Sequence, residues 1–490
     1  MTSAPLLGED VLTALVALVG LAGLVALGEG LRAWGVSART TRRIVHAGVG
    51  LFVASTPFLF TGPLPVYGLA AVFTVVNTGA RSRQLWAGIH EARPQSWGTV
   101  AMPLSVLPAL AATWSVSPDR ILAFQTAYLV LALADPVASW IGEGSPDDSR
   151  PDGSTIPGSL AFAASTFALT ASMLVVNEVP LGLVLTAAVG TTLVATLVES
   201  VSFRGWDNLF IVAAVVLVLV PIQEQFLSPL SLGLALVAGA AFAGLAYSAN
   251  ALDGRGAMTG GLFAASLVGL GGGPWIVPGL VFFGSSSAVT GVEWEGLLLS
   301  DESPRRTQAQ VLANGGVAWT ALAVAALVPE MRLWGYAAFI GALSAAAADT
   351  WATELGRLAP APPWSLRDGR RVPTGTSGAV SGVGTGAAVL GASSVVGAAL
   401  LLDGPLGGWV EWRAALLVGA GVMGMMIDGV AGAFLQAQYR DAPSEGWVEA
   451  PPSATAVPER GWRGIGNNVV NLIGTTTGAL VALTGAIGLG

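Results

Sequence analysis

The sequence contains no cysteine and no lysine, and it has only two histidines. Without cysteine there is no disulfide and no thiolate metal site. All 22 basic residues are therefore arginine, so a phosphate group must be bound by arginine, backbone amides or a metal ion. Charged residues make up only 11% of the 490 residues and hydrophobic residues 53%, which excludes a soluble domain of ordinary composition. We expect no nucleic-acid partner.

Long apolar runs separated by polar breaks are typical of an all-α, polytopic integral membrane protein. A helix needs about 20 apolar residues to cross the bilayer, with a wide range around that length. The runs predict about sixteen transmembrane helices with soft boundaries, approximately at residues 9–33, 44–61, 66–80, 99–115, 120–141, 157–176, 180–199, 207–221, 229–247, 257–270, 275–290, 308–328, 334–350, 378–402, 412–436 and 466–488.

The arginines gather in alternate loops, as the preference of basic residues for the cytoplasmic side requires. The first loop holds Arg39, Arg42 and Arg43, and the later odd-numbered loops hold most of the others, whereas only Arg120, Arg332 and Arg413 lie in or beside even-numbered loops. This pattern predicts a cell-membrane protein with cytoplasmic odd-numbered loops and both termini outside. Every candidate site residue then faces the cytoplasm.

Polar residues recur at span ends with a period of eight spans, which suggests two tandem parallel halves. We assign residues 1–225 and 226–490 to these halves. Common ancestry stays a hypothesis, because a chain of many spans can be paired in this way without a duplication.

Candidate ligands for a cation and a phosphate lie at span ends in the first half. Asp135 ends an apolar run, and an ionisable group at that depth must face a cavity, a partner or an ion. A loop with Asp147, Asp148 and Asp152 follows, and Gly158 and Ser159 open the next span. Hard cations take oxygen ligands and glycine-rich backbone cradles phosphate. The combination suits Mg²⁺ and phosphate.

His46 and Glu199 complete the catalytic candidates of the first half. Arg42 or Arg43, one turn before His46, would face the same anionic ligand. The structural alternatives are a hydrogen-bonded histidine and a Glu199–Arg204 ion pair. We assign Asp135 and Glu199 to metal binding, Asp135, Glu199 and His46 to catalysis, and phosphate or nucleotide binding to Arg42, Arg43, His90, Gly158, Ser159, Asp207 and Asn208.

The second half offers Asp349, Glu354 and Asp428 as metal ligands, with Asp349 and Asp428 also as catalytic groups. Asp349 and Glu354 lie near one helix end and would both reach one cation if the turn unwinds. The glycine-rich segment from Gly375 would present amides to phosphate where the next span begins, or would only allow close helix packing. The phosphate or nucleotide candidates are Asp253, Arg305, Arg306, Gln310, Asn314, Gly375, Thr376, Ser377, Gly378, Asn467 and Asn468.

Five motifs of the first half, in order, resemble those of the phytol kinase and dolichol kinase family of membrane polyprenol kinases. They are TRRIVHAGVGLF (41–52), GIHEARPQSWGTVAMPLS (88–105), LADPVASWIG (133–142), STIPGSLAF (154–162) and ATLVESVSFRGWDNL (195–209). Arg43 and Ser154 stand where that family commonly has lysine. Arg43 keeps the charge, whereas Ser154 does not, which leaves the phosphate contact there to Arg150.

The second half resembles a separate membrane family that includes phytyl-phosphate kinase. The matching strings are ANALDGRGAMTGG (250–261), FFGSSSAVT (282–290), RRTQAQVLANGG (305–316), ADTWATELG (348–356), VPTGTSGAVSGVG (372–384), MIDGVAGAFLQ (426–436) and GNNVVNL (466–472). These long strings are the most specific signal in the sequence.

The two resemblances imply a bifunctional isoprenoid salvage enzyme. Its first half would phosphorylate a prenyl alcohol such as phytol or geranylgeraniol, and its second half would convert the monophosphate to the diphosphate. CTP or another nucleoside triphosphate would be the donor, with Mg²⁺ as the cofactor. Two alternatives stay open, a nucleotidyltransferase that makes a CDP-lipid and a secondary transporter with parallel repeats. Chain length, saturation, donor base and oligomeric state do not follow from the sequence.

Overall fold

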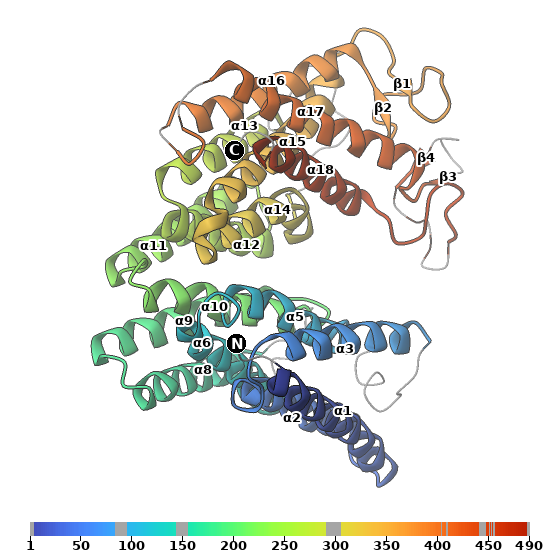
Figure 1. The fold of residues 1–490 in the computed structure, drawn as a ribbon. Helices are drawn as coiled ribbons and strands as arrows, with labels where there is room; N and C mark the ends of the chain where they lie inside the picture. Colours follow the sequence, from blue (N-terminus) through green and yellow to red (C-terminus); the bar gives the residue numbers. More distant parts are fainter. Residues whose placement is uncertain are drawn as a thin grey trace. The chain divides into compact units, whose positions relative to one another are not determined.

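The computed structural model is helical and divides into two compact units, Met1–Pro229 and Leu230–Gly490 (Figure 1). The sequence placed the boundary between the halves at residues 225 and 226. The structure describes residues 4–83, 96–143, 155–290, 305–402, 404–407, 410–440, 447–449, 451, 453 and 456–487.

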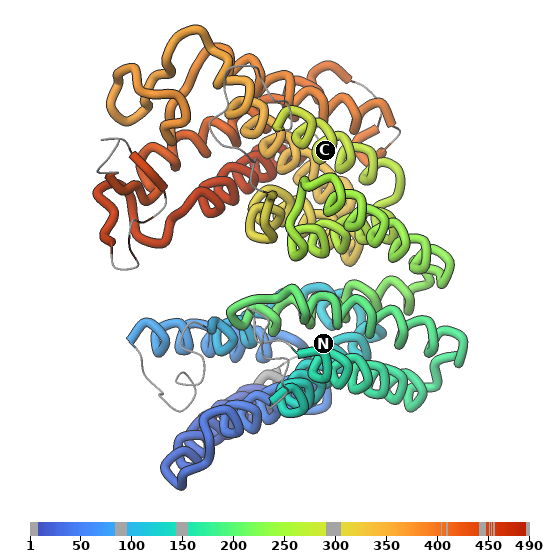
Figure 2. The backbone as a smooth tube through the Cα atoms, turned by 180° about the vertical axis from the view of Figure 1, so that it is seen from behind, coloured from blue at the N-terminus to red at the C-terminus, as the bar shows by residue number. Residues whose placement is uncertain are grey.

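The first unit is built from helices that mostly run back and forth against their neighbours in the chain. Figure 2 shows α8, α9 and α10 side by side in this way. The elements are α1 (Ala4–Ala33), α2 (Ala38–Leu59), α3 (Leu64–Ser82), α5 (Gly98–Ala112), the 3₁₀ turn η1 (Pro118–Arg120), α6 (Ile121–Leu129), the π-helix η2 (Val130–Ala134), α7 (Asp135–Gly142), α8 (Ile156–Val176), α9 (Leu181–Val201) and α10 (Asp207–Gln223).

The second unit adds two short antiparallel strand pairs to its helices, β1 (Trp364–Ser365) with β2 (Ala379–Val380) and β3 (Tyr439–Arg440) with β4 (Trp447–Val448). Its helices are α11 (Pro229–Ser248), α12 (Gly254–Ser266), the π-helix η3 (Leu267–Gly271), α13 (Gly273–Thr290), α14 (Gln308–Leu327), the 3₁₀ turn η4 (Pro329–Met331), α15 (Arg332–Gly356), α16 (Gly382–Leu400), α17 (Glu411–Phe434) and α18 (Asn467–Ile487).

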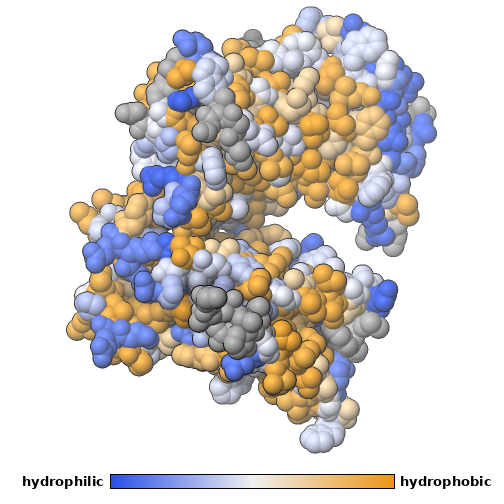
Figure 3. All heavy atoms as spheres, viewed as in Figure 1, coloured by the Kyte–Doolittle hydropathy of each residue, from blue (hydrophilic) through white to orange (hydrophobic). Residues whose placement is uncertain are grey.

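Each segment that the sequence predicts to span the membrane falls on a helix. Within the described residues, nine helices are long and apolar enough to cross a bilayer. Some of the others are too short, since α5, α10 and α12 have only 15, 17 and 13 residues, and α2 and α15 carry charged side chains in one of their end turns. Apolar side chains also cover much of the visible face in Figure 3. The protein is an integral membrane protein, whereas the crossing of all sixteen segments stays a prediction.

Several helices begin with a side-chain cap, which satisfies amide groups that a helix leaves unpaired in its first turn. The capping residues are Ser37 of α2, Thr155 of α8, Asp253 of α12, Thr307 of α14 and Ser381 of α16. All five precede spans that the sequence predicts to start from the cytoplasmic side. Polar, hydrogen-bonding residues are therefore concentrated at the helix ends where the candidate sites lie.

A buried helix lies at the centre of each unit. The helix α6 and its continuation η2 pack against α2, α8 and α10, and α15 packs against α13, α14, α16, α17 and α18. Small residues make this possible, because Gly341 of α15 contacts the backbone of α18 at Gly478. Each central segment contains a fully buried alanine, Ala134 at the end of η2 and Ala348 within α15. The next residue in each case is a candidate aspartate, Asp135 or Asp349.

Candidate functional site

In the first unit, His46 of α2 lies beside Asp135 at the end of a π-helix. Pro136 has no N–H, so the next acceptor in the i→i−5 series of η2, the carbonyl oxygen of Leu131, receives no hydrogen bond from it. His46 Nε2 donates to that oxygen over 3.0 Å, which fixes the proton on Nε2 in this arrangement. The same nitrogen lies 3.6 Å from Asp135 Oδ2. The helix irregularity therefore places a histidine from α2 beside the aspartate.

Arg42 and Asp207 lie close to the same pair. Asp207, the first residue of α10, interacts electrostatically with Asp135, Arg42 and His46. Arg42 lies one turn before His46 in α2, on the same helix face. The structure thus gathers two carboxylates, one guanidinium and one imidazole from three helices.

A backbone contact between two motifs of the first half holds Asp207 in place. Trp97 N donates to Arg204 O over 2.6 Å, and Asn208 Nδ2 donates to Gly98 O over 2.8 Å. Gly205 has φ +86°, and a Cβ at this position would overlap the backbone of Gly98. Glycine is needed here for both conformation and space, so this contact fixes the start of α10.

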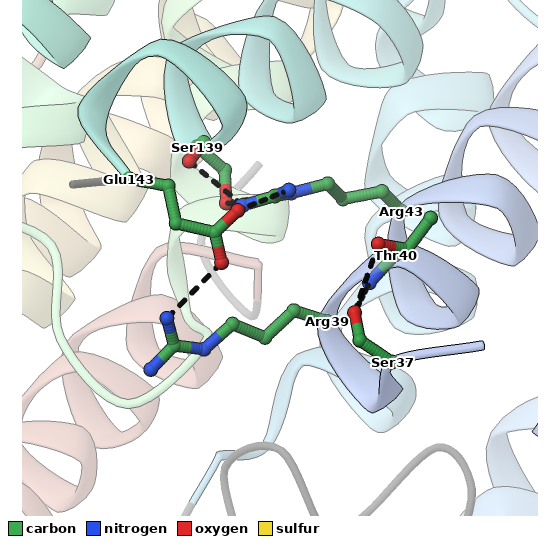
Figure 4. Close-up of polar contacts among 6 residues, drawn as sticks. All are labelled: Ser37, Arg39, Thr40, Arg43, Ser139 and Glu143. Carbon is green, nitrogen blue, oxygen red and sulfur yellow. Dashed lines mark hydrogen bonds and ion pairs between the residues drawn. The ribbon is translucent and has the colours of Figure 1, made fainter. Parts of the chain in front are cut away.

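Arg43 faces α7, whereas Arg42 lies near Asp207. The sequence alone gave no reason to distinguish the two residues. Arg43 donates to Glu143 Oε2 over 2.7 Å and to the backbone oxygen of Ser139 over 2.8 Å, and Arg39 donates to Glu143 Oε1 over 3.0 Å (Figure 4). Arg39 and Arg43 are one turn apart, so both face α7. This face of α2 fastens α7 instead of presenting a free cation.

These hydrogen bonds, first from Arg43 and then from Arg39, hold the pKa of the Glu143 carboxyl below its usual value. The contact is therefore complete above the ordinary glutamate pKa of about 4.3. It is lost as the pH falls through the lower pKa of the folded state.

Gly158, Ser159 and Glu199 lie on two helices that pack together, α8 and α9. Gly158 contacts α7, because a Cβ there would lie 3.1 Å from Ala138 O, and Glu199 lies in the last turn of α9. His90 and the loop aspartates Asp147, Asp148 and Asp152 lie outside the described residues.

In the second unit, Asp349 and Asp428 line one small pocket. The pocket encloses about 170 Å³ of empty space between α14, α15, α17 and α18, and Asn314, Asn471 and Thr475 line it too. Asn471 Nδ2 donates to Asn314 Oδ1 over 3.2 Å. Two carboxylates from different helices therefore face a polar pocket beside a pair of amides.

The Asp428 carboxylate has an unfilled hydrogen-bonding position. Its Oδ2 is buried, and no hydrogen-bond partner reaches it within the described part of the chain. A buried polar atom without a partner calls for a water or an ion. No group of three His, Asp or Glu side chains able to hold a metal occurs among the described residues, but Mg²⁺ is commonly held by one or two carboxylates together with substrate phosphates. The Asp349–Asp428 pair fits that kind of site.

Glu354 connects this acidic pair to Arg306. It accepts from Arg357 Nη1 over 3.0 Å, and it interacts electrostatically with both Asp349 and Arg306. Arg306 itself donates to neutral oxygens, those of Ser286 and Thr290. Glu354 thus interacts with two arginines as well as with Asp349, and its role as a metal ligand stays a prediction.

The other candidates before α14 and in its first turn have structural partners. Asp253 Oδ1 accepts from Gly256 N over 2.6 Å as the cap of α12. Gln310 Oε1 accepts from Thr307 N over 2.8 Å in a capping box. Arg305 donates to Asn250 Oδ1 and lies over the ring of Tyr247. These contacts orient the segment that carries Arg306 and Asn314.

The segment Gly375–Gly378 does not open the helix, contrary to the prediction. The helix α16 begins at Gly382, where Ser381 provides the cap. Gly375 and Gly378 have positive φ, and Gly378 packs directly on Ala433. Thr376 Oγ1 donates to Pro373 O, and Ser377 Oγ donates to Gln436 Oε1 over 2.7 Å. Gly378 therefore serves close packing, the alternative that the sequence left open, whereas a Cβ at Gly375 would meet no neighbour within 4 Å; phosphate binding by this segment stays a prediction.

Asn467 and Asn468 begin α18, but neither lines the acidic pocket; Asn471 and Thr475, further along the helix, do. Sequence reasoning missed this second pair, although it follows Asn467 at intervals of four residues, which places all three residues on one helix face.

A loop carboxylate near Asp428 was also missed. Glu449 follows β4 and interacts electrostatically with Asp428. Its neighbour Trp447 lies 4.0 Å under the guanidinium of Arg460, which pairs with Asp368 over 3.1 Å. Nothing in the sequence spacing indicates these contacts.

The helical fold and its polar helix ends define an integral membrane protein with two polar sites, each next to a buried helix. Residues 237–479, most of the second unit, match the model of a protein family described as integral membrane protein DUF92. No solved structure matches the chain.

Proposed function

We propose that the protein is a membrane-embedded lipid kinase that works in two steps. The first unit would transfer a phosphoryl group from CTP or another nucleoside triphosphate to a prenyl alcohol, and the second unit would phosphorylate the resulting monophosphate. The observation that carries this proposal is the meeting of two aspartates from different helices in each unit. Paired carboxylates, with Arg42 and His46 or with Asn314 and Asn471, suit a metal-bound nucleoside triphosphate.

Asp135 and Asp207 would hold Mg²⁺ in the first unit, and Asp349 and Asp428 in the second. Bound there with the nucleotide, Mg²⁺ supplies neutralisation of the phosphate charge. Arg42 would bind phosphoryl oxygens, and Asn314 and Asn471 would donate amide hydrogens to them in the second unit. Little covalent chemistry is asked of the side chains, because phosphoryl transfer depends mainly on positioning and charge.

The two steps differ in their need for a base. In the first, the alcohol oxygen bonds to the γ-phosphorus, CDP leaves and the hydroxyl proton must be accepted, for which Asp207 or Asp135 is in place beside His46. In the second, the nucleophile is a phosphate oxygen that is already largely deprotonated near pH 7. Both histidines, His46 and His90, lie in the first half, in keeping with this difference.

Labelled CTP tests the proposal and separates its rivals. Membranes containing the full chain would be given geranylgeraniol, Mg²⁺ and CTP labelled in either the α or the γ phosphate. We expect γ label, and no α label, in the lipid monophosphate and diphosphate. Label from the α phosphate would establish a nucleotidyltransferase instead, and uptake of the alcohol or its phosphate without product would favour a transporter.

The proposal places both sites at the cytoplasmic face of a sixteen-span protein. Because the chain has no cysteine, Thr374→Cys and Glu178→Cys each introduce a single thiol at an exposed loop position. An impermeant thiol reagent added to intact cells should label the cysteine at position 178 and spare that at 374 until the cells are opened. Labelling of position 374 from outside would contradict the topology.

A further inference from the structure

A pocket in the described part of the second unit is lined mostly by apolar side chains, and its polar lining residues are Arg306, Gln310 and Asn314. It contains about 650 Å³ of space not filled by atoms, part of which is open to the outside. Its walls come from α11 to α14 and include Phe242, Phe263 and Phe283. Phe242 and Phe283 meet edge to face, with ring centroids 4.7 Å apart.

Glycines widen the pocket. Gly260, Gly279 and Gly315 all line it, and a Cβ at Gly315 would reach Phe263 at 3.4 Å. Leu280, which also lines the pocket, is 52% exposed on α13. An apolar helix surface in a membrane protein contacts lipid, so a lipid chain can enter from the bilayer past Leu280.

The polar side chains of the pocket, Arg306 and Asn314 among them, have the chemistry of a phosphate-binding site. Arg306 is partly buried, and within the described residues it donates hydrogen bonds to the neutral oxygens of Ser286 and Thr290 and interacts electrostatically with the Glu354 carboxylate. Burial lowers the pKa of Arg306, so the cation is poorly solvated and gains from an anion. Asn314 lines both this pocket and the pocket of Asp349 and Asp428. A head group at Asn314 would therefore lie beside the acidic pair.

We propose that this pocket binds a lipid monophosphate with one apolar chain, the chain between the phenylalanines and the phosphate at Arg306 and Asn314. The inference rests on the proposed function and names the part of the second unit that selects its substrate. A two-chain phosphatidic acid has the same head group. A single apolar pocket lined by aromatic side chains favours one chain.

Binding without nucleotide tests the proposal separately from phosphoryl transfer. The full chain in detergent would be titrated with geranylgeranyl monophosphate, isopentenyl monophosphate or mixed micelles of dioleoyl phosphatidic acid. Ala264 lines the pocket, so Ala264→Phe should raise the Kd of the long monophosphate at least tenfold and change that of the short one by less than twofold. Ala241→Phe, an exposed position next to Phe242, is the matched control and should change neither.

Arg306→Gln should raise the Kd of geranylgeranyl monophosphate more than tenfold and leave the affinity for geranylgeraniol nearly unchanged. The proposal would be overturned if Ala264→Phe and Ala241→Phe changed the Kd of geranylgeranyl monophosphate equally. It would also be overturned if phosphatidic acid bound as tightly as this monophosphate and its binding were as sensitive to Ala264→Phe. Thermal unfolding would show whether each variant folds. If Ala264→Phe does not fold, a diazirine-bearing C20 monophosphate on the unaltered chain decides: labelling within residues 242–283 supports the pocket, and its absence refutes it.

Normal binding without transfer of γ label would refute the kinase proposal and leave the pocket standing. Transfer of γ label with unaltered kinetics in Ala264→Phe would refute the pocket and leave the kinase proposal standing.

Discussion

Asp135→Asn should lower phosphorylation of prenyl alcohol by about two to three orders of magnitude, the cost of removing one preorganised electrostatic group from an active site. Asparagine has nearly the same volume, so the contact of His46 with Leu131 can persist. The lost charge weakens the metal–nucleotide complex that Asp135 and Asp207 would share. Conversion of supplied geranylgeranyl monophosphate to diphosphate should continue, since the second unit has its own acidic pair. Thin-layer chromatography of products from labelled CTP measures both steps.

Glu143→Gln is the matched control for Asp135→Asn. It also removes a carboxylate charge, just after the end of α7, but Glu143 pairs with Arg39 and Arg43. We expect this variant to change alcohol phosphorylation by only a few fold. Equal loss of both steps in Asp135→Asn would mean that the units do not hold independent sites, and equal loss in the two variants would mean that α7 matters only for packing.

The positions of the helices follow from the sequence because bilayer thickness and hydrophobicity fix them locally. The segments predicted at 157–176 and 207–221 differ from α8 and α10 by two residues or fewer at each end. The approach of His46 to Asp135 could also be anticipated in part, since both lie at span ends on the same predicted side. The resemblance to polyprenol kinases pointed to the same residues.

Contacts between distant segments could not be predicted in this way. Arg43 pairs with Glu143, which lies 100 residues away, and no local pattern distinguishes Arg43 from Arg42. Pro136 donates no hydrogen bond to the carbonyl oxygen of Leu131 in the π-helix, and the donor that reaches this oxygen is a histidine from another helix. In the second unit the sequence indicated Asn467 and Asn468, whereas the pocket is lined by Asn471. Helix rotation decides this, and rotation is set by packing against α14, α15 and α17.

Asp349→Asn should separate the two steps in the opposite direction. Membranes given geranylgeraniol, CTP and Mg²⁺ should accumulate the monophosphate, while formation of the diphosphate falls by about two to three orders of magnitude. The physical reason is the acidic pocket: Asp349 and Asp428 face the same space, and Asp428 alone provides half of the charge that a cation there requires. Mass spectrometry of the extracted lipids gives the ratio of monophosphate to diphosphate.

Two variants of α17 make the Asp349 test specific. Asp428→Asn removes the other carboxylate of the pocket and should produce the same accumulation of monophosphate. Glu411→Gln removes an exposed carboxylate at the far end of the same helix and should leave the ratio unchanged. Undiminished diphosphate in Asp349→Asn would refute its role in the second step. Loss of both products in a folded Asp349→Asn protein would instead require one site shared by both steps, because two sites in series cannot lose the first product when only the second is damaged.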